Sequence, residues 1–317
     1  MKKGTKIGLL IGILLLAFGL TVLKIAHHRG EDFTVQLSGV TVSNKLGYDQ
    51  KGYTVCSSGE ESFSAKSVRS LRLDWLSGSV NVERYDGKDV LVRESSAARL
   101  SEDECLRWKL SGGELSILPC ANGVRNLPEK QLTVLLPQGL TLKTFDADVA
   151  SASVLVGGID TSDELSIDSA SGSLRVEDCR CDELKLNSAS GAQTVLRTEV
   201  RGDVKANMAS GAFSSEMLSC AKLAVESGSG SLRVEELRCR SAKAHSASGS
   251  VQLGFAEAPE KVEVDTASGS VTLAFPRGTG LDLNYDTGSG KLRGEVVYGD
   301  LPVDVDTASG GLTIEYR

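Results

Sequence analysis

This sequence contains little histidine and tryptophan, and it has no excess of positive charge. Its 317 residues include only 3 His and 2 Trp, and aromatic residues make up 5%. Scarce histidine leaves little material for acid–base or metal chemistry. The 42 Asp and Glu residues outnumber the 35 Lys and Arg residues, which argues against nucleic acid as a partner. The hydrophobic fraction of 40% and the charged fraction of 24% are those of a folded protein.

One stretch near the N-terminus is long and apolar enough to cross a membrane. It runs from Ile7 to Leu23 without a charged residue, and three lysines precede it. As a helix it would span roughly 25 Å, close to the lower limit for a bilayer, and Lys24 can extend the span by snorkelling. We therefore predict a transmembrane anchor over residues 7–26. A cleaved signal peptide is the alternative, although Lys24-Ile25-Ala26 matches a cleavage site poorly.

An internal repeat dominates the second half of the chain. A glycine closes a short tetrad, usually Ser or Thr, a small residue, Ser and Gly, at intervals of 19 to 21 residues. The eight glycines, each predicted to occupy a turn, are Gly172, Gly191, Gly211, Gly230, Gly249, Gly269, Gly290 and Gly310. Apolar residues recur at fixed offsets, seven and five positions before each glycine and two and four positions after it. A spacing of two within each pair predicts strands with one buried face.

Each repeat therefore reads as strand, tight turn, strand and loop, and a single unit cannot bury its own apolar face. Stacking successive units gives one continuous core. We predict an all-β fold, a single-stranded parallel β-helix or β-solenoid with coils of about 20 residues, preceded by one transmembrane helix. An antiparallel meander or sandwich of short strands is the competing interpretation.

The chain divides into five predicted segments. A cytoplasmic N-terminus and the anchor are followed by a linker and juxtamembrane segment, a β-rich N-terminal part of the solenoid and the regular repeats. Leu76-Ser77-Gly78-Ser79-Val80 is a divergent copy of the repeat unit, a hairpin is expected around Ser111-Gly112-Gly113, and Ser101-Glu102-Asp103-Glu104 is expected to open a short helix. In chain order, the cytoplasmic N-terminus covers residues 1–6, the anchor 7–26, the linker and juxtamembrane segment 27–64, the β-rich N-terminal part of the solenoid 65–150 and the regular repeats 151–317.

The chain resembles the bacterial "putative-adhesin" family of β-strand-repeat proteins, a domain of unknown function. The resemblance lies in the apolar start, in Leu76-Ser77-Gly78-Ser79-Val80, in Leu135-Leu136-Pro137 and in repeats such as Leu165-Ser166-Ile167-Asp168-Ser169-Ala170-Ser171-Gly172. It covers roughly residues 65–317. It implies a membrane-anchored, extracytoplasmic β-solenoid, with some members linked to cell-envelope stress responses. It offers no catalytic residues to carry over.

Seven cysteines suit an exported protein only in part, because an odd number leaves at least one thiol unpaired within a monomer. Cys220 and Cys239 each lie nine positions after a repeat glycine, on adjacent predicted coils. Their Cα atoms would then lie about 5 Å apart, which suits a disulfide. Cys105 and Cys120 flank the predicted hairpin and form the second candidate pair.

Two metal sites are conceivable, and both are weak. An outward column is expected four positions before each glycine: Asp168, Asn187, Asn207, Glu226, His245, Asp265, Asp286 and Asp306. The carboxylates of Asp265, Asp286 and Asp306 would stack closely enough for Ca²⁺ to screen their repulsion. Solvated carboxylates that cap the turn backbone are the simpler interpretation. A zinc site would need the thiols of Cys179, Cys181, Cys220 and Cys239, with Cys181 reaching past an intervening coil.

Catalysis has little support in the sequence. Asp286-Thr287-Gly288-Ser289 looks like an aspartic-protease loop, but Asp265-Thr266-Ala267-Ser268 occupies the same repeat position, so the string belongs to the repeat. Trp75 and Trp108 both precede the regular coils, which leaves no aromatic groove of the kind that polysaccharide lyases use. We therefore predict no enzymatic activity and no cofactor.

The leading prediction is a non-enzymatic protein of the cell membrane, single-pass, with its C-terminal domain outside the cytoplasm. It would act as a putative adhesin or envelope scaffold for another envelope protein, a wall polymer or a second copy through the last coil, Leu312–Arg317. An accessory or sensor protein of an envelope stress response is the alternative, and a carbohydrate-active β-helix enzyme is the second alternative. The sequence names neither the partner nor the disulfide pairing.

Overall fold

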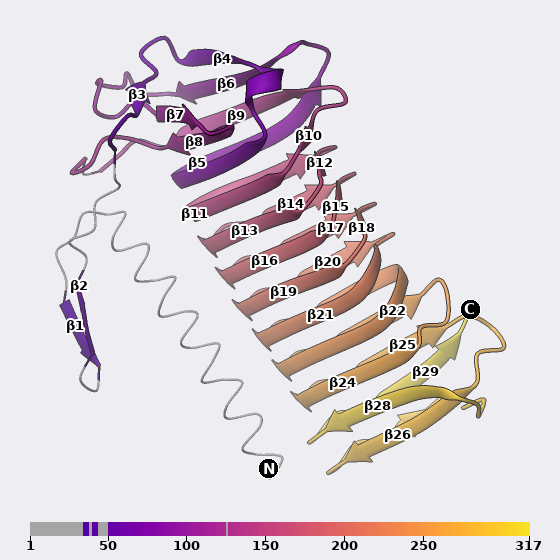
Figure 1. The fold of residues 1–317 in the computed structure, drawn as a ribbon. Helices are drawn as coiled ribbons and strands as arrows, with labels where there is room; N and C mark the ends of the chain where they lie inside the picture. The colour runs from indigo at the N-terminus through magenta and orange to yellow at the C-terminus, as the bar shows by residue number, and fades with distance from the viewer. Residues whose placement is uncertain (1–33, 38–39, 44–49, 125) are drawn as a thin grey trace.

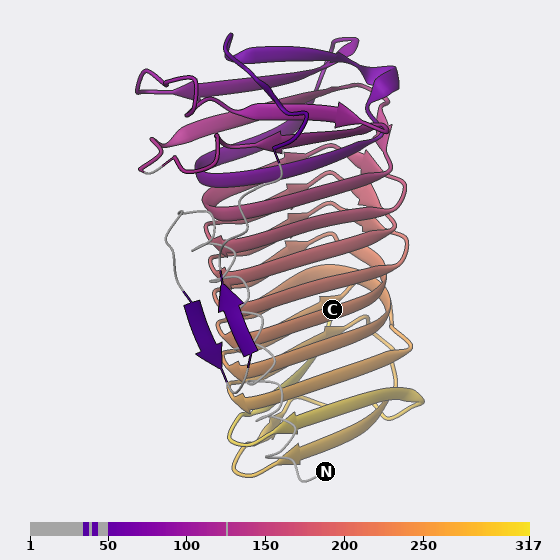
Figure 2. The ribbon, with the colours of Figure 1, turned by 60° about the vertical axis from the view of Figure 1, so that its left-hand side comes forward.

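The computed structural model describes residues 34–37, 40–43, 50–124 and 126–317. Nearly all described strands join one continuous β-sheet that winds into a stack of coils (Figure 1). Successive coils pair in parallel and in register, for example Leu165 with Leu184 and Leu184 with Val204. The predicted parallel β-solenoid is therefore confirmed, and the antiparallel sandwich is wrong for the regular coils. Figure 2 shows the elongated stack with the N-terminal strands gathered at one end.

Most coils contain a long strand, a corner at the repeat glycine and a shorter strand. The long strands form a first sheet from β13 (Glu164–Ser171), β16 (Glu183–Ser190), β19 (Asp203–Ser210), β21 (Ser219–Ser229), the second half of β22 (Leu232–Ser248), β24 (Lys261–Ser268), β28 (Leu301–Thr307) and β26 (Leu281–Thr287). The shorter strands form a second sheet from β14 (Leu174–Glu177), β17 (Gln193–Leu196), β20 (Phe213–Glu216), the first half of β22, β23 (Val251–Phe255), β25 (Val271–Phe275), β29 (Leu312–Tyr316) and β27 (Leu292–Arg293). Short strands complete several coils, namely β10 (Thr141–Leu142), β12 (Asp160–Thr161), β15 (Arg180–Cys181) and β18 (Glu199–Val200).

The core consists of the apolar columns that the repeat predicts. Side chains seven and five positions before each glycine are buried, except the half-buried Leu283 and Tyr285 before Gly290. Most of those two and four positions after it are buried too. Two polar residues, Gln193 and Ser215, replace apolar ones in these columns and are buried as well. Phe255 and Phe275 stack on adjacent coils with ring centroids 5.1 Å apart. Burial of one face per strand is what holds the coils together.

The eight repeat glycines do not all adopt the same backbone conformation. The first six, from Gly172 to Gly269, have φ between +124° and +152°, a conformation that residues with a Cβ atom rarely adopt. Gly290 and Gly310 do not have a positive φ in this range. In those two turns the hydroxyl of Thr287 or Thr307 accepts the glycine N–H, at 2.7 and 2.5 Å respectively. The turn is thus made differently in the last two coils of the sequence.

The solenoid begins earlier than the regular repeats. β11 (Thr144–Gly157) pairs in parallel with β5 (Ser70–Tyr85) over nearly its whole length, and Gly78 lies at the corner of β5. The divergent repeat copy predicted around Ser77-Gly78-Ser79 is therefore confirmed as a coil. The hairpin predicted around Gly112 is also confirmed, as β7 (Arg107–Ser111) and β8 (Glu114–Leu118).

Six strands close the N-terminal end of the stack, and we call them the cap: β3 (Thr54–Val55), β4 (Glu60–Ser64), β6 (Asp89–Ser96), β7, β8 and β9 (Lys130–Pro137). β8 and β9 pair in parallel with the two halves of β5, while β6 and β7 pair with them in antiparallel orientation. The ring of Phe63 from β4 meets the ring of Trp108 from β7 edge to face, with centroids 4.8 Å apart. The cap thus covers the end of the core with side chains.

The helix expected at Ser101-Glu102-Asp103-Glu104 is wrong. The backbone N–H and hydroxyl of Ser101 both donate to the carboxylate of Glu104 at 2.7 Å, which is the contact of a capping box. The segment nevertheless forms only a turn. Its next residues, from Leu106, enter strand pairing in the cap, so no helical turn can follow. One 3₁₀ turn, η1 (Ala65–Ser67), is present among the described residues.

The last two coils lie in reversed order, which corrects the prediction of an exposed C-terminal coil. β28 pairs with β24 on one side and with β26 on the other, so the strand that comes later in sequence is inserted inside the stack (Figure 1). Leu312 and Ile314 of β29 are accordingly buried. Val305 of β28 fits the narrow apolar column, whereas Tyr285 of β26 stays half-buried with its hydroxyl donating to Gly310 O at 2.9 Å. The coil at the end of the stack is therefore residues 281–300, which we call the end coil.

The predicted anchor over residues 7–26 and the N-terminal segment 1–6 lie outside the described residues. Within the described ranges, no helix has the length and apolarity needed to cross a bilayer. The predicted linker, residues 27–64, contains an antiparallel hairpin of β1 (Thr34–Leu37) and β2 (Val40–Ser43) as well as β3 and β4.

Candidate functional site

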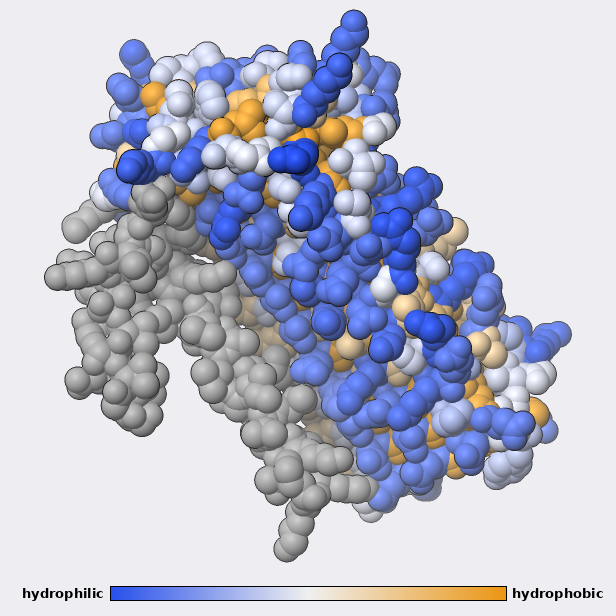
Figure 3. Space-filling model, in the orientation of Figure 1, coloured by the Kyte–Doolittle hydropathy of each residue, from blue (hydrophilic) through white to orange (hydrophobic). Residues whose placement is uncertain are grey.

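A column of polar side chains follows the outer face of the first sheet. Its members are register partners in the spatial order Asp168, Asn187, Asn207, Glu226, His245, Asp265, Asp306 and Asp286. None of them is buried, which confirms the predicted outward column. We call this set the outer column. The face of the regular coils seen in Figure 3 is largely hydrophilic.

Amide side chains link the first part of the outer column. Asn207 Nδ2 donates to Asn187 Oδ1 at 2.9 Å, and Asn187 Nδ2 donates to Asp168 Oδ1 at 2.7 Å. Asn187 both accepts and donates along the stack, so this part of the column is held by its own hydrogen bonds. It offers no convergent ligands.

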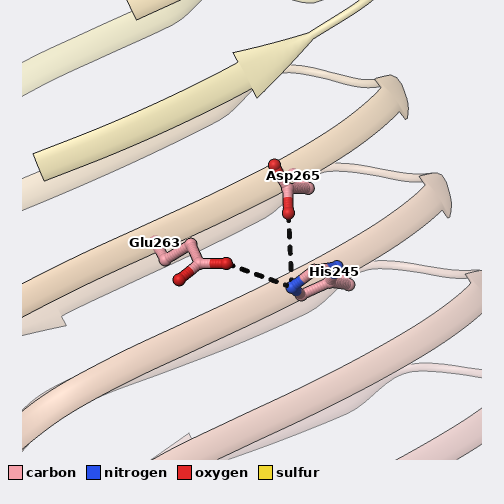
Figure 4. Close-up of side chains that lie close together, drawn as sticks. All are labelled: His245, Glu263 and Asp265. Atoms are coloured by element: carbon pink, nitrogen blue, oxygen red, sulfur yellow. Dashed lines mark ion pairs between the residues drawn. The ribbon is translucent and has the colours of Figure 1, made fainter. Parts of the chain in front are cut away.

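The second part of the outer column brings an imidazole against two carboxylates (Figure 4). His245 of β22 lies beside Asp265 of β24, with Nε2 3.3 Å from Asp265 Oδ2. Glu263 lies two positions before Asp265 on the same face of β24, and its Oε1 is 4.0 Å from His245 Nε2. Parallel register thus places the three side chains together, since two come from one strand and the third from its direct neighbour.

Two lysines balance part of this negative charge. Lys243 Nζ lies 2.9 Å from Glu263 Oε1, and Lys261 Nζ lies 3.4 Å from Glu263 Oε2. The hydrogen bond from Lys243 lowers the pKa of the Glu263 carboxyl below its usual value. Glu263 is therefore ionised at neutral pH, and it is held in place by charge-assisted contacts.

Burial shifts the pKa values of His245 and Asp265 toward their neutral forms. Desolvation lowers the pKa of His245, although the carboxylate of Asp265 opposes that shift. Desolvation also raises the pKa of Asp265, although His245 opposes it. Burial therefore offsets part of the attraction between the two charged groups. At neutral pH the His245 imidazole is largely in its neutral form.

The structure brings together only part of the predicted calcium site. Asp265, Asp306 and Asp286 are stacked on three neighbouring strands, in that order. Among the described residues, however, the one group of three or more ligating side chains whose donor atoms converge is His245, Glu263 and Asp265. Asp286 and Asp306 are outside that group. Sequence reasoning placed His245 and Asp265 in one column but missed Glu263. The signal for Glu263 was its position two residues before Asp265, which puts both side chains on the same face of one strand.

Two of the seven cysteines lie side by side on adjacent coils. Cys220 and Cys239 are register partners on β21 and β22, so the adjacency predicted from the repeat is confirmed. Burial raises the pKa of Cys239 to about 12 and raises that of Cys220 as well. All seven cysteines are free thiols in this structure, and the disulfide pairing stays a prediction.

The four thiols considered for zinc do not form a convergent group in the described part of the chain. Cys181 pairs in register with Val200, which separates it from Cys220 as expected. Burial raises the pKa values of Cys179 and Cys181 to about 12, so both thiols are protonated at neutral pH. Since zinc is bound by the thiolate, these buried side chains suit packing better than metal binding.

A buried ion pair in the cap escaped the sequence analysis. Lys130 Nζ lies 2.5 Å from Glu94 Oε1, and both side chains are 2% exposed. Lys130 also donates to the carbonyl oxygens of Glu104 and Pro119, and it lies 4.9 Å from the centre of the Trp75 ring. Cys105 and Cys120 lie beside this pair, since its charges act on both thiols. The two candidate disulfide partners of the cap are therefore near the same buried charges.

Comparison with known proteins supports the fold and the family. The profile described as Toastrack DUF4097 matches residues 98–315. Among solved structures, a "putative adhesin" from Parabacteroides distasonis is 12% identical and has a TM-score of 0.52, with 84% of this chain and 97% of that chain covered. At this identity the likeness concerns the fold alone.

Two further solved structures give weaker overlap. A "putative adhesin" from Bacteroides fragilis is 14% identical, with a TM-score of 0.42 and coverage of 81% of this chain and 96% of that chain. A "putative lipid binding protein" from Parabacteroides distasonis is 14% identical, with a TM-score of 0.49 and coverage of 80% and 94%. No curated protein matches the chain.

Proposed function

Because the chain belongs to the Toastrack DUF4097 family, whose profile covers more than half of it, we infer that it is a non-enzymatic β-solenoid scaffold of the cell envelope. The scaffold is anchored in the cell membrane by residues 7–26, and its solenoid lies outside the cytoplasm, where it binds a surface partner. The family and the solved neighbours described as adhesins support a binding role rather than an enzymatic one.

The observation that carries this proposal is the difference between the two ends of the stack. The cap covers one end, and its outer strand β4 carries Glu60 and Glu61, which discourage pairing with another strand. At the other end, no described strand pairs with the outer edge of β26, apart from a bridge between Leu281 and Tyr298. A rigid stack with one closed end and one open end can bind a partner in a defined orientation.

Exposed apolar side chains gather at this open end. Four large hydrophobic residues are exposed in the described ranges, and three of them, Leu292, Val297 and Tyr298, belong to the end coil. Tyr298 is 82% exposed. Exposed apolar residues clustered beside an open strand edge are typical of an interaction surface. We assign the docking surface of the scaffold to the end coil.

The charge of the solenoid restricts its partners. Residues 153–317 contain 16 Lys and Arg against 25 Asp and Glu, so this half of the chain is acidic. An acidic surface repels anionic wall polymers and lipid head groups unless divalent cations lie between them. A second copy that meets the end coil through apolar contacts avoids this repulsion.

Self-association through the end coil gives the first prediction. Since the cap closes the other end, two copies must meet end coil to end coil, which gives a two-fold dimer and not a fibre. We expect the full-length chain in detergent to dimerise as its concentration rises, as measured by sedimentation. Replacing Leu292 and Tyr298 together with serine should weaken the dimer at least tenfold, on the order of the free energy of burying one large apolar side chain.

The matched control for this experiment is Met217→Ser. Met217 and Leu292 are each 43% exposed, but Met217 lies in the middle of the stack. This variant should dimerise like the wild type. Equal weakening by both variants, or a dimer unaffected by the end-coil substitutions, would rule out the end coil as the docking surface.

Location gives the second prediction. Protease added to intact cells should remove the solenoid, because the anchor leaves it on the outer side of the membrane. In sealed, inverted membrane vesicles the solenoid lies inside the vesicle, so the same protease should leave it intact. A solenoid protected in intact cells would place it in the cytoplasm and would contradict the scaffold of the envelope. A partner captured only through residues 1–30 would instead favour a sensor that acts through the membrane span.

A further inference from the structure

One imidazole nitrogen on the outer face of the first sheet is shielded from solvent and has no hydrogen bond. His245 Nε2 has no accessible surface and no hydrogen-bond partner within the described part of the chain. The side chain is 15% exposed, and Nε2 is directed at the carboxylates of Asp265 and Glu263 (Figure 4). When Nε2 carries no proton, its lone pair and the two carboxylates present only electron pairs to one another. A cation between them would remove that repulsion.

The spacing of the three donor atoms suits a transition metal. One atom from each of His245, Glu263 and Asp265 lies within 4.8 Å of the other two. Metal–ligand distances of about 2.0–2.2 Å place neighbouring donors of a tetrahedral zinc site about 3.3–3.5 Å apart. The distance of 3.3 Å between His245 Nε2 and Asp265 Oδ2 already meets this value. The distance of 4.0 Å to Glu263 Oε1 needs only a small rotation of the flexible Glu263 side chain.

Charge around the cluster favours a cation as well. Glu226 and Asp306 are the next members of the outer column on either side of the His245–Asp265 pair. Together with Glu263 and Asp265 they form four acidic groups, of which Glu263 contacts the two lysines Lys243 and Lys261. A divalent ion between these groups would neutralise part of their negative charge.

We propose that His245, Asp265 and Glu263 form a surface site for a divalent transition metal of the zinc class. An imidazole with two carboxylates is a donor set for zinc or cobalt, whereas calcium and magnesium prefer oxygen ligands alone. Three protein ligands leave one position open to water. The site does not depend on the proposed scaffold function, since it rests only on the geometry of β22 and β24.

The two lysines moderate the affinity of this site. Both ammonium groups contact the Glu263 carboxylate and compete with the metal for it. Replacing Lys261 with glutamine should therefore tighten metal binding severalfold. The same sheet contains a similar lysine-bridged carboxylate without a histidine, in which Lys185 contacts Glu164 and Glu183. Glu164→Gln is thus a matched control for Glu263→Gln.

The test is titration of the full-length chain with Zn²⁺ by calorimetry, and with Co²⁺ by visible absorption. His27→Asn and His28→Asn form the background, because these two histidines lie outside the described residues. We expect one equivalent of Zn²⁺ and a Co²⁺ spectrum typical of nitrogen and oxygen ligands. His245→Gln and Asp265→Asn should each weaken binding at least tenfold, since loss of even an outer-shell partner costs about 10–100-fold. Glu263→Gln should also weaken it, and Glu164→Gln should leave it unchanged.

Three results would overturn the proposal. They are no Zn²⁺ binding in the background chain, equal binding in the His245→Gln variant, or a Co²⁺ spectrum with intense thiolate charge-transfer bands. The last result would move the metal to the cysteines. Thermal unfolding of each variant without metal is compared with that of the background, and this comparison separates lost binding from lost folding.

Discussion

Gly230→Ala is expected to lower the melting temperature of the protein by on the order of 10 °C. The added methyl group would enter the place where the backbones of two coils leave least room for a Cβ atom. A Cβ atom at Gly230 would lie 1.7 Å from the carbonyl oxygen of Gly211 on the preceding coil. Gly230 also has φ of +139°, a conformation that an alanine adopts only with strain. Strain and overpacking together should cost about 2–5 kcal/mol.

The neighbouring coils cannot relieve this contact easily. The oxygen belongs to another turn in the same glycine column, and a shift of one coil would move the strands that pair with it. In a repeat stack each coil contacts its neighbours, so damage at one interface weakens the cooperative unit on both sides. Circular dichroism during heating measures the change, and amide hydrogen exchange should show the largest loss of protection around β21 and β22.

Gly112→Ala provides the control for this prediction. Gly112 also has a positive φ, of +60°, but a Cβ atom there would meet nothing within 4 Å. It lies in the turn between β7 and β8, where only the left-handed conformation itself is strained. The cost should be about 1 kcal/mol. A Gly230→Ala protein that melts no earlier than Gly112→Ala would refute the close stacking of the turns.

Lys130→Met should destabilise the cap by about 3–5 kcal/mol, the usual cost of breaking a buried ion pair from one side. The substitution leaves the Glu94 carboxylate buried, with only the N–H of Leu106 as a donor at 3.0–3.1 Å. It also leaves the carbonyl oxygens of Glu104 and Pro119 without the ammonium that now binds them. The methionine keeps much of the apolar contact with Trp75, so lost charge rather than lost volume explains the effect.

A second substitution tests this explanation. Glu94→Gln in the Lys130→Met background removes the isolated charge and still leaves an oxygen for the N–H of Leu106. It should recover part of the lost free energy of unfolding. Arg93→Met is the control. Arg93 lies next to Glu94 on β6 and forms an ion pair with Glu60 of the neighbouring strand β4, but both of these side chains are about half exposed. Its cost should be below about 1 kcal/mol. If Lys130→Met costs no more than Arg93→Met in urea unfolding, the pair is not buried as described.

The regular half of the molecule could be predicted from particular residues. Leu165, Leu184 and Val204 recur at one offset from a glycine, and a parallel sheet requires such equal spacing for its side chains to stack in register. The same register placed Cys220 beside Cys239, and His245 beside Asp265. Since the coils repeat with nearly one length, position in the repeat was enough to determine position along the stack.

The exceptions lie where contacts join residues without a common offset. Lys130 meets Glu94 from a different strand of the cap, and no periodicity connects the two. Glu263 approaches His245 because a neighbouring strand and an offset of two residues combine, which the column alone did not reveal. The capping-box contact between Ser101 and Glu104 formed as expected, but strand pairing from Leu106 onward prevented a helix.

The sequence by itself determined the coil length, the inward and outward faces and the parallel stacking, because these follow from a local period that is present in every repeat. Only the tertiary structure decided the ends. The cap closes the stack through antiparallel pairs between distant segments, and β28, which follows β26 in the sequence, lies inside the stack between β24 and β26. Sequence order does not dictate spatial order there, since the place of each strand depends on which side chains fit the core and which tolerate exposure at its open end.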